Sequence, residues 1–225
     1  MRPCLLLFTK PAEPGRVKTR LIGDLNPQQA AALHVAFLDD LVAQLRGGDY
    51  ELRLAWAMGD GEEMPDRAEP GLRQRGAGLG DRLYHALADA AAEFPRVAAL
   101  GSDHPDLPRE RVGQAFAALG RSDVALGPAR DGGYYLIALR AAAVEPRLFE
   151  DLPWSTSELF ERTLERCREL GLRVELLPQA SDVDTPDDLR RLAERLAADP
   201  RACPRTRALL HAWGRLPVAA PFSPS

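Results

Sequence analysis

The feature that most constrains the fold is a regular alternation of two residue patterns along the chain. Short apolar runs typical of strands occupy residues 3–9, 51–58, 96–101, 123–127, 133–139 and 172–177. Amphipathic stretches typical of helices occupy residues 27–46, 79–93, 109–119, 156–170, a segment that begins at 185, and 201–213. Alternation of this kind favours parallel strands joined by helices that cover the sheet. We therefore expect a three-layer α/β/α sandwich with a mostly parallel, mixed sheet.

Capping residues mark where three of these helices begin. Asn26 stands before Pro27, and Thr185 stands before Pro186 and two aspartates. Ser155 is followed by Glu158 three residues later, which is the spacing of a capping box. Each of these positions can satisfy backbone N–H groups that a helix leaves without a partner.

The length bounds the number of domains. The 225 residues suit one domain with a small addition. We place the domain at residues 1–199 and assign residues 200–225 to a C-terminal helix and a flexible tail rich in Pro and Ser. The sequence leaves open whether the chain is a monomer or a homodimer.

Charge and cysteine content exclude several function classes. The formal net charge of −4 and the 6% of aromatic residues disfavour a nucleic-acid binder, which normally carries a basic excess or an aromatic platform. The three cysteines lie far apart, so the sequence predicts neither a zinc site nor a disulfide framework, and a cytoplasmic location fits. No apolar stretch approaches the roughly 20 residues that a membrane helix needs.

The stretch RVAALGSDHPDLP, residues 96–108, ends an apolar strand in two carboxylates. Ligands bind at the carboxyl ends of strands in sheets of this class, which is where Asp103 is expected. Magnesium takes one or two carboxylates together with substrate phosphates and waters. We interpret Asp103 as a metal ligand and Asp106 as a cap for the helix that begins at 109.

The loop after the first strand, FTKPAEPGRVKTRL, is rich in cations. It places Lys10, Arg16, Lys18 and Arg20 within eleven residues, together with Gly15 and Thr19. Backbone N–H groups and cationic side chains in such a loop can hold phosphates. From the spacing alone, a solvated charged loop is equally compatible.

Two further stretches carry candidate ligand-binding groups. QRGAGLGDRL places alternating glycines before a helix, where the backbone can approach a planar ligand, although a flexible turn would look the same. GPARDGGYY contains turn residues at Asp131, Gly132 and Gly133. In SDVDTPDDL, Asp184 is the better metal candidate, and the neighbouring acids fit structural roles at a helix start.

Taken together and in this order, these stretches resemble a known family. It is the bacterial glycosyltransferase-like family with arsenosugar-biosynthesis members, within the nucleotide-diphospho-sugar transferase (glycosyltransferase-A) superfamily. More distant relatives are the 2-phospho-lactate and molybdenum-cofactor guanylyltransferases. The resemblance covers about residues 3–197. Its motifs match at Phe8, Lys10, Pro14–Gly15, Val17–Leu21, Gln74, Gly76, Leu79–Gly80, Arg82, Gly101–Asp103, Pro105, Leu107, Gly127–Ala129, Asp131–Ile137, Trp154–Thr156 and Asp182–Leu189.

The resemblance implies a glycosyltransferase-A fold and a role for each motif. The basic loop, with Lys10, Gly15, Lys18, Thr19 and Arg20, would hold a diphosphate. Asp103 would bind Mg²⁺ or Mn²⁺, with Asp184 as a second ligand. Gln74, Gly76 and Gly80 would bind the base, and Ser102 would also contact the substrate. The sugar or acceptor would lie against Gly132, Gly133 and Tyr134. The pocket rim would consist of Trp154, Ser155 and Thr156. Ala77 and Gly78 stand where family members often carry an acid, so specificity is open.

These assignments predict a metal-dependent transferase that uses a nucleotide-activated donor. A glycosyltransferase would pass a sugar from a nucleotide sugar to a small-molecule acceptor. A guanylyltransferase-like nucleotidyltransferase would use a nucleoside triphosphate with the same residues. A metal ion on Asp103 would neutralise the diphosphate, and Lys10, Lys18 and Arg20 would stabilise the charge as the bond to phosphate breaks. Asp131 is the candidate base, although a role in its turn is at least as compatible with the sequence. The third hypothesis is a non-catalytic nucleotide-binding protein with the same fold.

Overall fold

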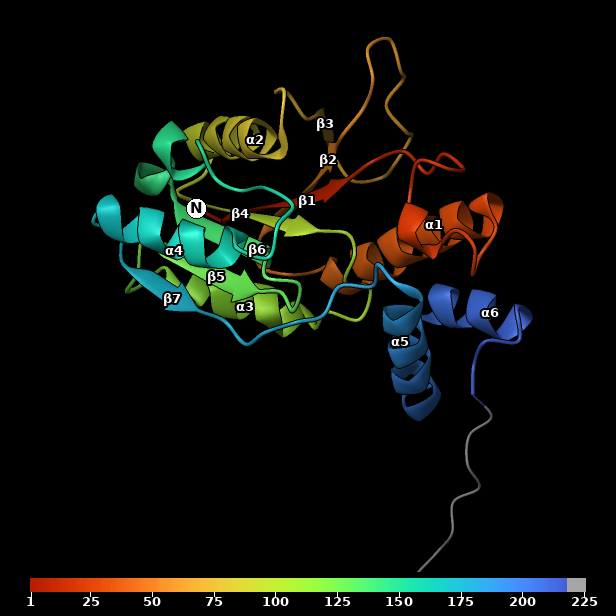
Figure 1. Cartoon of the computed structure of the whole chain (residues 1–225). Coiled ribbons are helices and arrows are strands. Elements are labelled where there is room, and N and C mark those ends of the chain that lie inside the picture. Colours follow the sequence, from red (N-terminus) through yellow and green to blue (C-terminus); the bar gives the residue numbers. More distant parts are fainter. Residues whose placement is uncertain (218–225) are drawn as a thin grey trace, which may run out of the picture. The chain divides into compact units, whose positions relative to one another are not determined.

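The computed structural model describes residues 1–217; residues 218–225 of the expected tail lie outside the described residues. Its centre is a seven-stranded sheet in the order β3-β2-β1-β4-β6-β5-β7 (Figure 1). Strand β6 runs antiparallel to β4 and β5, and the other pairs are parallel. The strands are β1 (Cys4–Thr9), β2 (Glu51–Trp56), β3 (Gly71–Arg73), β4 (Arg96–Gly101), β5 (Val124–Pro128), β6 (Tyr134–Arg140) and β7 (Val174–Leu176). The predicted mixed, mostly parallel α/β fold is confirmed.

The helices follow the predicted segments closely. They are α1 (Pro27–Leu45), α2 (Leu79–Glu93), α3 (Arg109–Ala118), α4 (Leu159–Glu169), α5 (Pro186–Ala198) and α6 (Pro204–Ala212). Three short 3₁₀ turns, η1 (Thr19–Leu21), η2 (Ala141–Ala143) and η3 (Pro146–Leu148), complete the elements. Within residues 1–217, no helix combines the length and the apolar character that a membrane span needs.

The chain divides into two compact units, and neither is continuous in sequence. One, the sheet unit, comprises Met1–Pro11, Gln44–Ser102 and Leu107–Asp182. The other, the helical unit, comprises Ala12–Ala43, Asp103–Asp106 and, within the described residues, 183–217. The predicted boundary between residues 199 and 200 stays a prediction.

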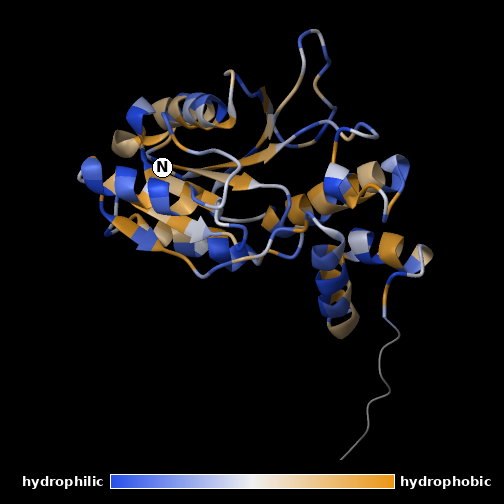
Figure 2. Cartoon of the chain, viewed as in Figure 1, coloured by the Kyte–Doolittle hydropathy of each residue, from blue (hydrophilic) through white to orange (hydrophobic). Residues whose placement is uncertain are grey.

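In the sheet unit, side chains alternate between two covered faces, as strand geometry requires. Val97 and Ala99 of β4 share one buried cluster with Leu87 of α2 and Cys167 of α4. Helix α3 lies across the sheet from α2 (Figure 1) and contacts β5. The strands are largely apolar, whereas α2 and α4 turn hydrophilic residues outward (Figure 2). Because both faces of the sheet are covered, the sequences of the central strands are continuously apolar and do not alternate between apolar and polar residues.

The helical unit has its own core. Leu33 and Phe37 of α1 pack with Leu192 of α5 and Leu210 of α6, and all four are buried. The predicted cap at Asn26 is confirmed, because its side chain accepts from the Gln29 N–H at 2.8 Å. The cap at Thr185 is confirmed as well.

Three local details differ from the sequence predictions. Strand β3 was not predicted, because three residues that are mostly exposed carry no periodic signal. Ser155 does not cap α4: it has φ of +64°, and Glu158 stands at the cap position without a side-chain bond. Asp106 does not cap α3, which begins after Pro108; its carboxylate instead accepts from Arg195 Nε at 2.7 Å.

The capping box at the start of α5 gives a stability prediction. The Thr185 side chain accepts from the Asp188 N–H, and the Asp188 carboxylate accepts from the Thr185 N–H at 2.8 Å. Thr185→Ala should lower the free energy of unfolding by about 1 kcal/mol, since it leaves a helix N–H without its partner. Thr185→Ser keeps the hydroxyl and is the matched control. Chemical denaturation of both variants checks this, and an equal loss in the two would contradict the capping account.

Candidate functional site

The helical unit holds a buried ammonium group with carboxylates around it. The Lys18 side chain is 2% exposed, and its Nζ lies 2.5 Å from Asp103 Oδ1 and 3.1 Å from Asp184 Oδ1. The ammonium also donates to the Val183 carbonyl oxygen at 2.7 Å, and it lies 5.3 Å from the centroid of the Phe37 ring. All three N–H bonds of the ammonium therefore have an acceptor, as a buried charge requires.

The chain brings these groups together from three separate segments. Asp103 follows the end of β4 by two residues, and Asp184 immediately precedes the Thr185 cap of α5. The Val183 N–H donates to the Asp103 carbonyl oxygen at 3.0 Å, which ties the two acidic segments to each other. Lys18 is in the left-handed backbone region, with φ of 46° and ψ of 40°, at the start of η1. The resemblance paired Asp103 with Asp184 as metal ligands and assigned Lys18 to the phosphate-binding loop. The structure brings all three together in one cluster, the Lys18 cluster.

The electrostatics of the Lys18 cluster favour the charged forms. Burial alone would lower the pKa of Lys18, but the two carboxylates outweigh it and raise the pKa above the ordinary lysine value. Burial would likewise raise the pKa of Asp103, but the Lys18 charge and hydrogen bond outweigh burial and hold this pKa below its usual range. Both shifts favour the charged forms of Lys18 and Asp103 at neutral pH.

Two histidines near Asp103 were not singled out from the sequence. His34 and His104 are 3% and 4% exposed, and the charge that each can carry lowers the pKa of Asp103. His104 adjoins Asp103 in the chain, and His34 adjoins the apolar stripe of α1 that contains Leu33 and Phe37. Their positions were therefore visible in the sequence, but scattered histidines gave no ligand spacing.

The remainder of the basic loop is more open. The Arg20 side chain is 70% exposed and lies 3.9 Å from Asp184 Oδ2. Thr19 and Lys10 are exposed, and Gly15 adopts a φ of +82° with no neighbouring atoms where a Cβ would stand. Because the Lys18 ammonium already serves three protein acceptors, a phosphate would have to be held first by the exposed cations.

Asp103 and Asp184 fit the divalent metal ion that the fold family implies. They share one cation through their Oδ1 atoms, while their side chains remain 43% and 33% exposed. Two carboxylates, completed by phosphate oxygens and waters, match the ligands that magnesium prefers. Among residues 1–217 no group of three or more His, Cys, Asp or Glu side chains could hold a metal ion by itself, so phosphate oxygens would have to complete the shell.

In the sheet unit, the glycine-rich segment before α2 is shaped by internal contacts. Gln74 Nε2 donates to the Ala55 carbonyl oxygen at 2.8 Å. The Asp81 carboxylate accepts from the Ala77 and Gly78 N–H groups, so these N–H groups are engaged within the chain. Gly76 has φ of +132° and lies against Asp81, where a Cβ would have no room. Their predicted role in binding the base stays a prediction.

The turn between β5 and β6 rests on the segment before α4. A Cβ on Gly132, at φ +90°, would lie 2.1 Å from the Ser157 carbonyl oxygen, and the Phe160 N–H donates to the Gly132 carbonyl oxygen at 2.9 Å. Asp131 Oδ1 accepts from the Gly133 N–H at 2.9 Å. The predicted turn role of Asp131 is therefore observed, and its role as a base stays a prediction.

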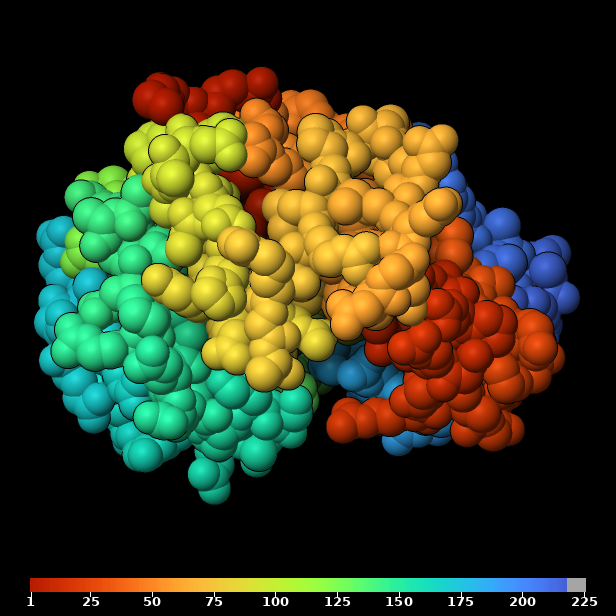
Figure 3. Space-filling model, turned by 90° about the horizontal axis from the view of Figure 1, so that it is seen from above, coloured from red at the N-terminus to blue at the C-terminus, as the bar shows by residue number. Residues whose placement is uncertain are grey.

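Trp154 and Tyr134 line a common hollow of about 120 Å³. Their roles at the pocket rim and on the sugar or acceptor side, which the resemblance implies, stay predictions. Their rings meet edge to face, with centroids 6.3 Å apart. A Cβ on Gly80 would lie 2.5 Å from Trp154 Nε1, so this glycine allows α2 to approach the segment at 149–154. In Figure 3 the yellow surface of α2 adjoins the green-to-teal surface of that segment. The remaining lining residues are Phe8, Leu79, Leu83, Ala99, Leu100, Gly101, Tyr135, Ile137 and Leu159.

The other residues predicted near this pocket do not line it. Ser102 is buried, and its N–H donates to the Phe8 carbonyl oxygen at 3.1 Å. Ser155 and Thr156 are exposed, and the Thr156 hydroxyl donates to the Pro153 carbonyl oxygen at 2.8 Å. Their roles in binding stay predictions.

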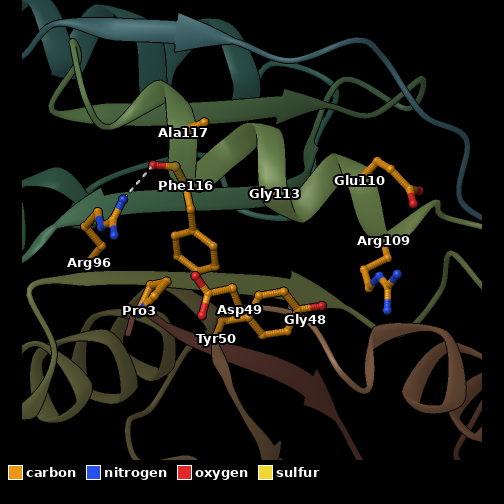
Figure 4. Close-up of a pocket in the computed structure, with 10 residues that line it drawn as sticks. All are labelled: Pro3, Gly48, Asp49, Tyr50, Arg96, Arg109, Glu110, Gly113, Phe116 and Ala117. Carbon is orange, nitrogen blue, oxygen red and sulfur yellow. Dashed lines mark hydrogen bonds between the residues drawn. The ribbon is translucent and has the colours of Figure 1, made fainter. Parts of the chain in front are cut away.

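A larger hollow of about 350 Å³ lies at the opposite end of the strands (Figure 4). It is lined by Tyr50, Arg96, Arg109 and Phe116, among others, and Arg96 Nη1 donates to the Phe116 carbonyl oxygen at 3.2 Å. None of the predicted site residues lines it. Because ligands of α/β sheets bind at the carboxyl ends of strands, the smaller hollow at the ends of β1 and β4 is the better candidate.

A scan of protein families matches residues 38–156, slightly more than half of the chain, to the family described as uncharacterized proteins conserved in bacteria (DUF2064). No curated protein has a sequence that matches this chain. A crystal structure from Desulfovibrio desulfuricans, of a protein with the provisional name nucleotide-diphospho-sugar transferase, is 35% identical with a TM-score of 0.89. That match covers 95% of this chain and 96% of the other.

Other solved structures share the fold at low identity. A cytidylyltransferase from Leptospira borgpetersenii has a TM-score of 0.59 and 11% identity, over 99% of this chain and 100% of its own. CMP:2-keto-3-deoxy-manno-octonic acid synthetase, in complex with CTP, has a TM-score of 0.52 and 13% identity, over 85% and 97% of the two chains. At this level of identity the likeness is one of fold.

The Lys18 cluster yields a pH-dependent stability prediction. Lys18→Met should lower the free energy of unfolding at pH 7 by about 3 kcal/mol, because it leaves two neighbouring carboxylates without their cation. The value lies at the low end of the range for buried pairs, since both carboxylates are partly exposed. Lys10→Met, an exposed change in the same loop, is the matched control.

The variant should also invert the effect of acid. In the wild type the pKa of Asp103 is lowered, so its stabilisation is present above its unfolded pKa and is lost as the pH falls through the lower folded pKa. In Lys18→Met, protonation of one carboxylate removes a repulsion, so stability should rise as the pH falls from 7 to about 4. Urea unfolding at the two pH values measures this; parallel pH profiles in both proteins would contradict the ion-pair account.

Proposed function

Because the chain belongs to the DUF2064 family and has the fold of nucleotide-diphospho-sugar transferases, we propose that it is a transferase acting on a nucleotide-activated donor. The reaction we favour is glycosyl transfer from a nucleotide sugar to a small-molecule acceptor. The observation that carries this proposal is the 35% identity, over 95% of the chain, to the protein provisionally named a nucleotide-diphospho-sugar transferase. The acidic pair of the Lys18 cluster supports it.

In the proposed reaction, an acceptor hydroxyl attacks the anomeric carbon of the donor sugar. The bond from that carbon to the diphosphate breaks, the nucleoside diphosphate leaves, and the hydroxyl proton passes to solvent or to a base. Asp103 and Asp184 would hold Mg²⁺ or Mn²⁺, which supplies positive charge against the leaving diphosphate. Arg20, whose guanidinium is exposed beside Asp184, would contact the same phosphates.

Lys18 has a positioning role in this proposal. Its ammonium fixes one oxygen of each carboxylate and leaves both side chains partly exposed. The two carboxylates are thereby held at a fixed spacing before any metal ion arrives. Such preorganisation avoids a reorganisation cost during the reaction.

A nucleotidyltransferase is the second candidate. Its support is the fold shared with a cytidylyltransferase and with a synthetase in complex with CTP. In that reaction an acceptor oxygen would attack the α-phosphorus of a nucleoside triphosphate, and pyrophosphate would leave. The same acidic pair and the same metal ion would serve it.

Thermal unfolding in the presence of nucleotides tests the proposal and separates the two candidates. The panel contains nucleoside triphosphates, diphosphates and nucleotide sugars, each with and without Mg²⁺ or Mn²⁺. A ligand at a hundredfold excess over its Kd stabilises the folded state by about 2.7 kcal/mol. We expect a metal-dependent stabilisation by nucleotide sugars of one base; stabilisation by a triphosphate alone would instead favour nucleotidyl transfer.

Asp103→Asn and Asp106→Asn form the matched pair of variants. Asp103→Asn should lose the metal-dependent part of the stabilisation, with at least about a tenfold weaker Kd, because a carboxylate ligand is removed. Asp106→Asn removes a nearby acid that pairs with Arg195, and it should keep that stabilisation. If no nucleotide stabilises the wild type, the chain is not a nucleotide-using transferase.

A further inference from the structure

The hollow beside Trp154 and Tyr134 is poor in available polar groups. The Trp154 indole N–H donates to the Phe149 carbonyl oxygen at 3.2 Å, and the Tyr135 hydroxyl donates to the Pro178 carbonyl oxygen at 3.1 Å. The Tyr134 hydroxyl is enclosed by protein atoms, so it is not open to a molecule in the hollow. A sugar ring would bury several hydroxyls here without a side-chain partner, and each unpaired hydroxyl costs roughly 1–3 kcal/mol. An apolar group suits this hollow better than a sugar does.

Gly101 provides a second, independent observation. It is the last residue of β4 and lines the hollow, and a Cβ built on it would meet no atom within 4 Å. Its φ lies outside the left-handed region, so neither a turn nor a close contact within the chain requires glycine there. A glycine in a strand commonly marks a place where a ligand comes close to the backbone.

The surroundings and the size of the hollow limit what can enter. Leu79, the first residue of α2, lines it and is 43% exposed, so the apolar lining extends to the surface. Its volume is about 120 Å³. A dry protein cavity of about 150 Å³ holds one benzene molecule. A single ring or a short branched alkyl chain is therefore the largest group that fits.

We propose that this hollow binds a small apolar group of the acceptor. This assignment rests on the proposed transferase function, because it identifies the occupant as the acceptor. The acceptor is then an amphiphilic small molecule: one end is a ring or a branched alkyl group, and the other carries the nucleophilic oxygen. The nucleotide and its sugar are held by groups other than this hollow.

The isoleucine methyl groups give a direct binding assay. The chain has two isoleucines: Ile137 lines the hollow, and Ile22 is a surface residue of the helical unit. In protein labelled with ¹³C at the isoleucine δ1 methyl groups, NMR should therefore show two signals. Benzyl alcohol should move the Ile137 signal to saturation and leave the Ile22 signal in place. Glucose at the same concentrations should move neither signal.

Two variants test the proposal. Gly101→Val fills the hollow and should abolish the response of Ile137 to benzyl alcohol. Leu79→Ser changes only an exposed side chain at the mouth, and it should weaken binding several-fold even if Gly101→Val fails to fold.

The outcomes separate this inference from the proposed function, because the NMR titration contains no nucleotide. An Ile137 signal that does not respond to benzyl alcohol, or that responds equally to glucose, overturns the apolar hollow even if nucleotides stabilise the protein. Binding of benzyl alcohol in a protein that no nucleotide stabilises overturns the assignment of the hollow to an acceptor.

Discussion

The buried ammonium of Lys18 is the interaction on which the helical unit depends. That unit is built from three pieces of chain that are far apart in sequence. Lys18 contacts both of the other pieces, through Asp103 in one and through Val183 and Asp184 in the other. The middle piece, Asp103–Asp106, is only four residues long and has little apolar surface to bury. It is held by polar contacts instead: the ion pair to Lys18, and the pairing of Asp106 with Arg195. Ion pairs therefore hold the segment Asp103–Asp106 in place, whereas apolar packing holds the rest of the helical unit together.

The same interaction connects stability with the proposed chemistry. A carboxylate pair placed without a cation would repel, whereas here the pair is held together by an ammonium while each side chain keeps contact with solvent. A site of this kind exists before a metal ion or a diphosphate arrives. The sequence suggested that Lys18 binds a phosphate. In the structure, its ammonium instead contacts Asp103 and Asp184, the two candidate metal ligands.

Sequence patterns were sufficient for the parts of the molecule that depend on local periodicity. Strand β4 and helix α2 were located from their apolar spacing, and Asn26 and Thr185 were recognised as caps from residue type and position. The resemblance to a sugar-transferase family added the fold, which the structure confirms. That Tyr134 and Trp154 line one hollow is a finding of the structure.

Features that depend on distant parts of the chain could not be predicted in this way. The pairing of Lys18 with Asp103 joins residues that no periodic pattern relates, and the division into two interleaved units leaves no mark in composition. The sequence shows a glycine at position 80, but not why a glycine is required there. The reason is that the Trp154 indole packs against α2, which is a contact between distant parts of the chain. Strand β3 was too short and too exposed to carry a signal.

The central claim is that Asp103 and Asp184 form a cation site whose resident cation is Lys18. The most direct test is the thermal stability of Lys18→Met, refolded and measured with and without millimolar Mg²⁺, beside the wild type under the same conditions. The account predicts that Mg²⁺ raises the Tm of the variant more than that of the wild type, because the ion replaces the missing ammonium. An equal response of the two proteins to Mg²⁺ would contradict it.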